Sequence, residues 1–178
     1  MVTHSPVVIV LASGRGERFV AAGGQGSKLH AMLAGKPVLT HTLDAVRASG
    51  LPWHLEDVGH EGMGDSIAAA VRATREAAGW LVLPGDLPLV LPATILAVAG
   101  ALAHHAVVVP VHDGRRGHPV GFAAICGPEL AALRGAQGAA PVVRAHAAFE
   151  LAVDDAGAVT DIDTPADLDA AARLLATR

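Results

Sequence analysis

The feature that most constrains the fold is a pair of short apolar runs, each stopped by a glycine-containing turn. Residues 7–11 (VVIVL) run into Ala-Ser-Gly, and residues 80–84 (WLVLP) run into Gly-Asp-Leu-Pro. Short apolar runs bounded by glycine are typical of strands buried on both faces. Such strands form parallel sheets that helices cover, so an α/β fold is expected.

Helical patterns lie between these runs. A helix is expected from Pro37, where Leu39, Leu43 and Val46 share one face, and Gly50 should end it. Further helices are expected over residues 66–78 and 92–104, with short ones starting at Pro128 and Ala139.

The other strands are shorter and more polar. Residues 53–64 are expected to hold one edge strand and a loop, and residues 106–125 two antiparallel strands around a charged glycine loop. Residues 149–155 and 158–163 are interpreted as two further strand pieces. The sheet should therefore be mixed and mostly parallel.

The C-terminal residues give the strongest helix signal. Thr164 can cap this helix, Pro165 suits its first position, and Asp167 completes a capping box. Strands alternating with helices along residues 1–178 predict a single domain, a three-layer αβα sandwich around a Rossmann-like sheet. In such sheets ligands bind beyond the carboxyl ends of the strands.

Composition excludes several classes of function. The formal net charge is −4 with no block of Lys and Arg, so a nucleic-acid-binding surface is not expected. No apolar run reaches the roughly 18 residues of a membrane-spanning helix, and residues 7–11 are interpreted as a strand rather than a signal peptide. A lone Cys126 excludes an intrachain disulfide. We therefore expect a cytoplasmic protein with neither a nucleic acid nor a membrane as partner.

A glycine-rich motif with three cations follows the first expected strand. Arg15 and Arg18 lie in ASGRGERF, and Lys28 follows ten residues later. Glycines let the backbone approach a phosphate chain, while the cations can neutralise it. Neither GxxxxGK[ST] nor GxGxxG is present, which excludes a P-loop and a dinucleotide fingerprint. The alternative is a glycine-rich turn with solvated charges.

Three carboxylates are candidate Mg²⁺ ligands. Asp86 follows the second apolar run, and Asp161 and Asp163 alternate in VTDID, so on an extended backbone they point to one side. Mg²⁺ takes one or two carboxylates together with phosphate oxygens of the substrate. The alternatives are local, because Asp86 can cap a turn and Asp163 can help to start the last helix.

Two further motifs can hold anions or a base. GRRGHPVGF, residues 114–122, has two arginines and a histidine that can bind a phosphorylated acceptor, although an exposed hairpin tip has the same composition. EGMGDS, residues 61–66, opens a helix whose N-terminus can bind an anion or a base edge. Simple capping by Asp65 or Ser66 explains the second motif equally well.

The order of these motifs resembles a known family. LASGRGERF…K, GMGDS, PGDLP, GRRGHPVGF and DIDTPADL are similar, from Val7 to about Leu174, to the motifs of MobA-like NTP transferases. The chain is most similar to molybdenum cofactor cytidylyltransferases, which carry LAAGxGxRxG…K, GMGxS, GDxP, GxxGHP and DIDTPxDL. The resemblance implies a nucleotide-diphospho-sugar transferase-like fold. It also implies transfer of CMP from CTP to the terminal phosphate of molybdopterin, with release of pyrophosphate and with Mg²⁺ as cofactor.

The resemblance implies roles for individual residues. Expected nucleotide contacts are Leu11, Ala12, Ser13, Gly14, Arg15, Gly16, Arg18, Lys28, Gly64 and Ser66. Expected acceptor contacts are Arg116, Gly117 and His118, and expected metal ligands are Asp86, Asp161 and Asp163. Asp86, with Arg18 and Lys28 as triphosphate clamps, is expected to carry catalysis. No general base is needed, because a phosphate nucleophile is already deprotonated near neutral pH.

The chain departs from the family pattern in four places. Ser13 replaces an alanine, the loop before Lys28 is longer, and the segment after Gly50 is shorter than in the family. GAQGAAP has Ala136 and Pro141 where the family often has an acid and an arginine. These departures bear on the acceptor and the base more than on the phosphate chemistry.

Two other interpretations stay open. The acceptor can be a sugar phosphate or another small phosphorylated molecule, with the same reaction. The shortened segment and the altered GAQGAAP also suit a non-catalytic nucleotide or cofactor carrier, whose partner would be a client molybdoenzyme. Retained Arg18, Lys28 and Asp86 favour the enzyme.

Overall fold

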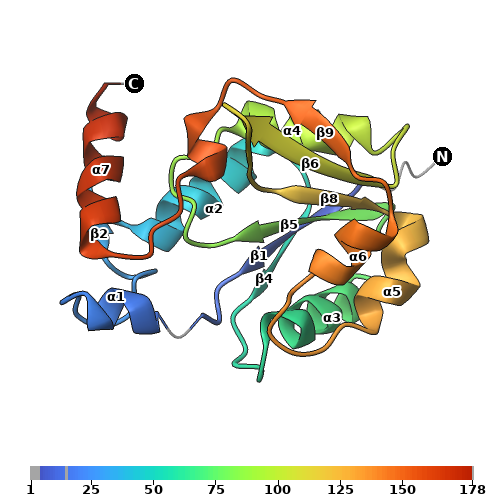
Figure 1. Cartoon of the computed structure of the whole chain (residues 1–178), viewed down its shortest axis with the longest axis horizontal. Helices are drawn as coiled ribbons and strands as arrows, with labels where there is room; N and C mark the ends of the chain where they lie inside the picture. Colours follow the sequence, from blue (N-terminus) through green and yellow to red (C-terminus); the bar gives the residue numbers. More distant parts are fainter. Residues whose placement is uncertain (1–4, 15, 178) are drawn as a thin grey trace.

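The computed structural model describes residues 5–14 and 16–177, and in them one mixed sheet forms the centre (Figure 1). The strand order is β4-β1-β5-β8-β6-β7, and β9 also pairs with β6. The strands are β1 (Val7–Leu11), β4 (Trp53–Glu56), β5 (Gly79–Pro84), β6 (Val107–His112), β7 (Arg115–Arg116), β8 (Val120–Ala123) and β9 (Phe149–Ala152). A separate ribbon pairs β2 (Met32–Leu33) with β3 (Lys36–Pro37).

Strand directions agree with the predicted mixed, mostly parallel sheet. β1 runs parallel to both β4 and β5, and β6 runs parallel to β9. β8 runs antiparallel between β5 and β6, and the short β7 runs antiparallel to β6. The carboxyl ends of β1, β4 and β5 therefore meet at one edge of the sheet.

Helices cover both faces of the sheet, which confirms the predicted αβα sandwich (Figure 1). They are α1 (Glu17–Ala21), α2 (Val38–Ser49), α3 (Met63–Ala73), α4 (Pro92–Ala101), α5 (Gly127–Ala131), α6 (Ala140–Ala145) and α7 (Pro165–Ala176), with 3₁₀ turns η1 (Ala124–Cys126) and η2 (Ala156–Val159). None of the helices within the described residues is both long enough and apolar enough to span a membrane.

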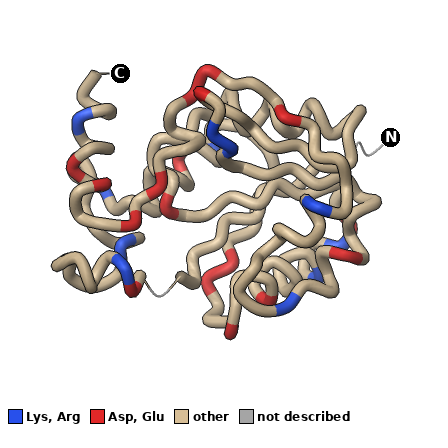
Figure 2. The backbone as a smooth tube through the Cα atoms, in the orientation of Figure 1, with Lys and Arg blue, Asp and Glu red and all other residues tan. Residues whose placement is uncertain are grey.

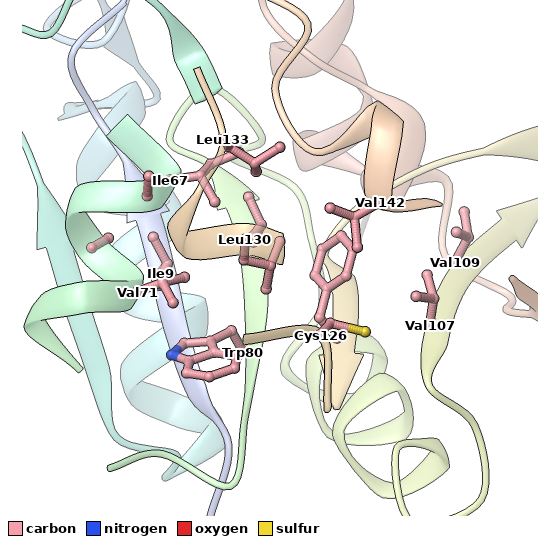
Figure 3. Close-up of a cluster of buried hydrophobic side chains, with 14 residues drawn as sticks. Ile9, Ile67, Val71, Trp80, Val107, Val109, Cys126, Leu130, Leu133 and Val142 are labelled. Atoms are coloured by element: carbon pink, nitrogen blue, oxygen red, sulfur yellow. The ribbon is translucent and has the colours of Figure 1, made fainter. Parts of the chain in front are cut away.

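Alternate residues of the strands supply two separate cores. Ile9 and Val82 face the side covered by α3, α5 and α6, where Trp80, Leu130 and Val142 are also buried (Figure 3). Val8, Val10, Leu81 and Leu83 face the other side and pack against α2 and α4. Such two-sided burial is the reason that the strands read as continuous apolar runs.

A third core brings α1 and α7 together beside the carboxyl edge of the sheet. Phe19 of α1, Leu33, Val38 and Ile162 are buried together with Ala171 of α7. The capping box predicted for α7 is present, because Thr164 accepts from the Asp167 backbone and Asp167 accepts from the Thr164 backbone. This core fixes α7 next to α1.

Two element predictions are wrong. α3 starts at Met63 and ends at Ala73, before the predicted residue 78, because the chain must turn there to enter β5. Residues 158–163 form no strand: Ala158 and Val159 belong to η2, and residues 160–163 continue as irregular backbone. The reason lies in tertiary contacts, since the amide of His118 donates to the carbonyl of Ala158 and the amide of Ile162 donates to that of Asp86.

Candidate active site

A cleft of about 710 Å³ opens at the carboxyl ends of β1 and β5. Its walls are the loop after β1, the start of α3, the turn after β5, the segment from β7 to His118, and residues 158–163. Figure 2 shows acidic and basic positions next to one another where α1 faces the start of α7. The cleft therefore lies where ligands bind in open α/β sheets.

Lys28 lies at the centre of the charged part of the cleft. Its Nζ donates to Asp86 Oδ2 at 2.6 Å and to Asp163 Oδ1 at 2.8 Å. Burial disfavours the charged form of Lys28, but the hydrogen bonds to Asp163 and Asp86 outweigh it and raise the pKa of Lys28 above its usual value. Lys28 therefore stays an ammonium between two carboxylates.

Asp86 is held at the turn by the backbone around it. Gly85 comes so close to β1 that a Cβ would meet the Leu11 carbonyl oxygen at 3.0 Å, and its amide donates to that oxygen at 2.9 Å. Thr42 donates to the Gly85 carbonyl at 2.8 Å. Asp86 Oδ1 is buried and has no hydrogen-bond partner among the described residues. A buried carboxylate oxygen in this condition is a ready ligand for a cation.

Asp163 joins α1 to the segment before α7. It accepts from Arg18 Nη1 through Oδ2 at 2.6 Å, while Oδ1 accepts from Lys28. Asp161 also lines the cleft and is exposed. The two aspartates thus share the cleft, although the extended strand expected to place them there does not exist.

The GRRGHP segment forms the opposite wall and differs from expectation in one respect. Arg116 is tied to Glu150 of β9, with Nε and Nη2 at 2.8 and 2.7 Å from Oε1. Arg115 Nη2 donates to the Val159 carbonyl at 3.2 Å, and both arginines line the cleft. Burial lowers the pKa of His118, although the charges of Asp86 and Asp161 oppose the shift. His118 is therefore neutral near pH 7.

The start of α3 closes the remaining side. Ser13 Oγ and Ser66 Oγ lie 3.2 Å apart and join the loop after β1 to the helix. Gly64 faces away from the cleft, where a Cβ would meet the Arg134 carbonyl oxygen at 2.8 Å. Asp65 accepts from the Gly135 amide at 2.8 Å, so part of EGMGDS serves packing.

Most of the residues predicted from the sequence meet in this cleft. The cleft is lined by Leu11, Ser13, Gly14, Gly16, Arg18, Lys28, Ser66, Asp86, Arg116, Gly117, His118, Asp161 and Asp163. Ala12 and Gly64 are not part of its lining. Arg15 lies outside the described residues.

Sequence reasoning missed a group at the carboxyl end of β4. His60 lines the cleft and is hydrogen-bonded to the buried Glu56, which also contacts His54. The only signal was a carboxylate at the end of an edge strand, followed closely by a histidine. Residues 5–14 and 16–177 contain no group of three His, Cys, Asp or Glu side chains arranged to hold a metal ion. Mg²⁺ does not need such a group, since it commonly takes one or two carboxylates plus substrate phosphates.

Comparison with known proteins identifies the class. The MobA-like NTP transferase domain matches residues 44–152, more than half of the chain. The chain therefore belongs to the MobA-like NTP transferase family and is a nucleotidyltransferase of that family. 

Solved structures share the fold over almost the whole chain. The crystal structure of Rv0371c from Mycobacterium tuberculosis H37Rv is 25% identical, has a TM-score of 0.81, and covers 97% of this chain and 100% of its own. A complex of Rv0371c with manganese, also 25% identical, has a TM-score of 0.75 and covers 98% and 100% of the two chains. Molybdopterin-guanine dinucleotide biosynthesis protein A from Archaeoglobus fulgidus is 22% identical, with a TM-score of 0.69 and coverage of 97% and 100%.

A curated relative matches a smaller part. The bifunctional protein GlmU of Desulfitobacterium hafniense is 30% identical over an alignment of 108 positions, and the match covers 49% of this chain and 23% of GlmU. The chain thus spans about a quarter of the length of that relative.

Proposed function

We propose that residues 1–178 act as one nucleotidyltransferase domain that transfers CMP from CTP to the terminal phosphate of a molybdopterin-type acceptor, releasing pyrophosphate. The observation that carries the reaction class is the Lys28 ammonium between Asp86 and Asp163, with Arg18 on the outer oxygen of Asp163. Three distant segments thereby place two carboxylates and two cations at the carboxyl edge of the sheet. The motif pattern and the family support the choice of CTP and acceptor.

The residues present fit a divalent cation such as Mg²⁺. Asp86 Oδ1 is buried without a partner among the described residues, and Asp163 accepts a hydrogen bond from Lys28, as Asp86 does through Oδ2. Asp86 and Asp163 would hold the ion, with Asp161 nearby in the cleft. When bound, the ion would offset the negative charge on the phosphate oxygens.

The protein's own part in the reaction is to bind and align. Arg18 and Lys28 bind the triphosphate, which requires Lys28 to exchange its carboxylate partners for phosphate oxygens. An oxygen of the acceptor phosphate attacks the α-phosphorus in line and forms the new P–O bond. The bond to the bridging oxygen breaks, and its electron pair leaves with pyrophosphate. Held cations stabilise the charge that spreads over the transferring group.

The acceptor would approach from the GRRGHP wall. Arg116 is already paired with Glu150, so Arg115, whose guanidinium touches only a carbonyl oxygen among the described residues, is the better placed cation for an acceptor phosphate. His118 is neutral and can donate or accept a hydrogen bond there. A sugar phosphate would use the same contacts, so the acceptor is decided by experiment.

The test is pyrophosphate release with Mg²⁺ and each of CTP, GTP, ATP and UTP, with molybdopterin-type acceptor, with a sugar phosphate, or with no acceptor. We expect release that depends on CTP and the molybdopterin-type acceptor. Another productive pair would keep the reaction and replace the substrate. Nucleotide binding without pyrophosphate release under any of these conditions would instead support a non-catalytic carrier function.

The role of Asp86 is tested by Asp86→Asn, which keeps the size of the side chain. Turnover should fall by at least about 100-fold, as expected when a charge-stabilising group is lost, with an unchanged circular dichroism spectrum. Asp44→Asn is the control, because Asp44 pairs with Lys36 on the surface and should be neutral. Equal activity of the two variants would refute the assignment of Asp86.

A further inference from the structure

A buried carboxylate with two histidines lies at the edge of the sheet, outside the charged site. Glu56 is the last residue of β4 and is only 6% exposed. Its Oε1 contacts His60 Nε2 at 3.1 Å, and its Oε2 contacts His54 Nε2 at 3.4 Å. A carboxylate buried this deeply is costly unless it is hydrogen-bonded, and the two histidines supply its side-chain partners.

Only one of the two histidines reaches the cleft. His60 lines it, whereas His54 points from the middle of β4 and is not part of the lining. Glu56 is paired in register with Leu11, and its carbonyl accepts from the Ala12 amide at 2.9 Å, so the group is anchored to the loop after β1. His60 thus lines the cleft while its Nε2 is hydrogen-bonded to the carboxylate of Glu56.

The contact with Glu56 determines what His60 can offer to a ligand. A carboxylate oxygen only accepts, so Nε2 carries a proton and donates to Glu56. In the neutral ring Nδ1 is then an acceptor, since the tautomer is set by the partner of the other nitrogen. Within residues 5–14 and 16–177, Nδ1 of His60 forms no hydrogen bond. In its neutral form the ring therefore keeps Nδ1 as an acceptor for a ligand.

The position of His60 fits a base and not a phosphate. Arg18 and Lys28 occupy the α1 side of the cleft, and the two arginines of β7 occupy the side opposite. The remaining wall consists of Ser13, His60, Glu61, Gly62, Met63 and Ser66, and it carries no Lys or Arg. When the phosphates of a nucleotide bind Lys28, its base must lie elsewhere in the cleft, and this wall, which lacks a cation and includes Met63, suits a flat heterocycle.

We propose that His60, positioned by Glu56, reads the base of the nucleotide by accepting a hydrogen bond from an exocyclic amine. For a pyrimidine this selects cytosine, whose 4-amino group donates. Uracil presents a carbonyl oxygen at the same place, so two acceptors would face each other. The inference rests on the proposed function and adds the residue that sets its preference for CTP over UTP.

The test measures dissociation constants of CTP and UTP by titration calorimetry in the presence of Mg²⁺. His60→Phe keeps a ring of similar shape without the acceptor, and should lower the CTP preference about 10-fold, chiefly by weakening CTP. His60→Asn should restore part of the preference, because its amide oxygen can accept. His60→Leu replaces His60→Phe if the phenyl ring prevents folding.

His54→Phe is the matched control, since it removes the other histidine from the same carboxylate without touching the cleft. It should leave the CTP to UTP ratio unchanged. An unchanged ratio in His60→Phe, or equal changes in both variants, would overturn the inference and make the cluster a packing device. The same holds if the unaltered protein binds CTP and UTP equally or binds neither.

Failure of this inference is distinguishable from failure of the proposed function. Selective CTP binding that depends on His60, without pyrophosphate release, would refute the proposed transferase activity and support recognition of the base by His60. Pyrophosphate release with a ratio insensitive to His60 would keep the transferase and refute the base reading.

Discussion

At the scale of single residues, Lys28 decides the state of the charged site. Its ammonium lies 2.6 Å from Asp86 Oδ2 and 2.8 Å from Asp163 Oδ1, with all three side chains mostly shielded from water. It therefore offsets part of the negative charge of the two carboxylates that are proposed to hold a cation. On the proposed function, a bound cation would compete with Lys28 for these two carboxylates until phosphates offer Lys28 another partner.

Lys28→Met should therefore change the affinities for the metal ion and for CTP in opposite directions. Mn²⁺ binding without nucleotide, followed by electron paramagnetic resonance, should tighten about 10-fold because the carboxylates lose their internal cation. The affinity for CTP should weaken by about 10- to 100-fold because a charged hydrogen bond to phosphate is lost. Lys36→Met, which breaks the surface pair with Asp44, serves as control and should change neither. Unchanged Mn²⁺ affinity in Lys28→Met would contradict the competition.

At the scale of elements, the site depends on close approach between the loop after β7 and the 3₁₀ turn η2. A Cβ on Gly117 would lie 2.3 Å from the Ala158 carbonyl oxygen, and the Gly117 amide donates to Pro110 on the other side. Gly117 thus has backbone on both sides. The residues that follow Ala158 include Asp161 and Asp163, so this contact helps to place both carboxylates.

Gly117→Ala should push residues 158–163 away from β7. We expect CTP affinity to fall by about 10-fold or more and the free energy of unfolding to fall by about 1–3 kcal/mol, the usual cost of overpacking. Gly100→Ala is the matched change, because Gly100 lies in α4 with open space around its Cα and should be neutral or slightly stabilising. The measurements are urea denaturation and calorimetry. A Gly117→Ala variant that behaves like Gly100→Ala would disprove the close approach.

At the scale of the whole molecule, the third core ties α1 and the segment that leads into α7 to the cleft. Phe19 follows Arg18, and Ile162 precedes Asp163, so both buried side chains are next to charged site residues. The main cores on either face of the sheet have no such direct link to Asp163. Stability and ligand binding should therefore respond differently to damage in different cores.

Ile162→Ala and Leu81→Ala test this difference, because both remove similar volume from fully buried positions. Each should lower the free energy of unfolding by about 2–5 kcal/mol in a denaturant titration. Only Ile162→Ala should also weaken CTP binding, by several-fold, measured at a temperature where both variants are folded. Equal CTP affinities would show that the third core supports α7 without positioning Asp163.

Local sequence was sufficient for the elements whose interactions are local. The runs at 7–11 and 80–84 predicted buried strands, and Thr164 with Asp167 predicted the cap of α7, because period, glycine stops and capping need only neighbouring residues. The sequence also placed the loop after β1 and Asp86 at one edge of the sheet, since residues that follow neighbouring parallel strands must meet there. It gave wrong ends for α3, where the turn into β5 intervenes.

Tertiary structure decided what depends on partners far along the chain. Residues 158–163 alternate like a strand, yet their amides and carbonyls pair with His118 and Asp86, so no ladder forms. From the sequence alone Arg116 is expected to bind the acceptor, but in the fold it is paired with Glu150. The contact of Glu56 with His60 borders the cleft only because β4 pairs with β1. The sequence by itself determined the class of fold and the kinds of charge at its edge. The pairing of those charges was decided by the packed chain, because an ion pair or a hydrogen bond depends on distance in space, which local patterns do not encode.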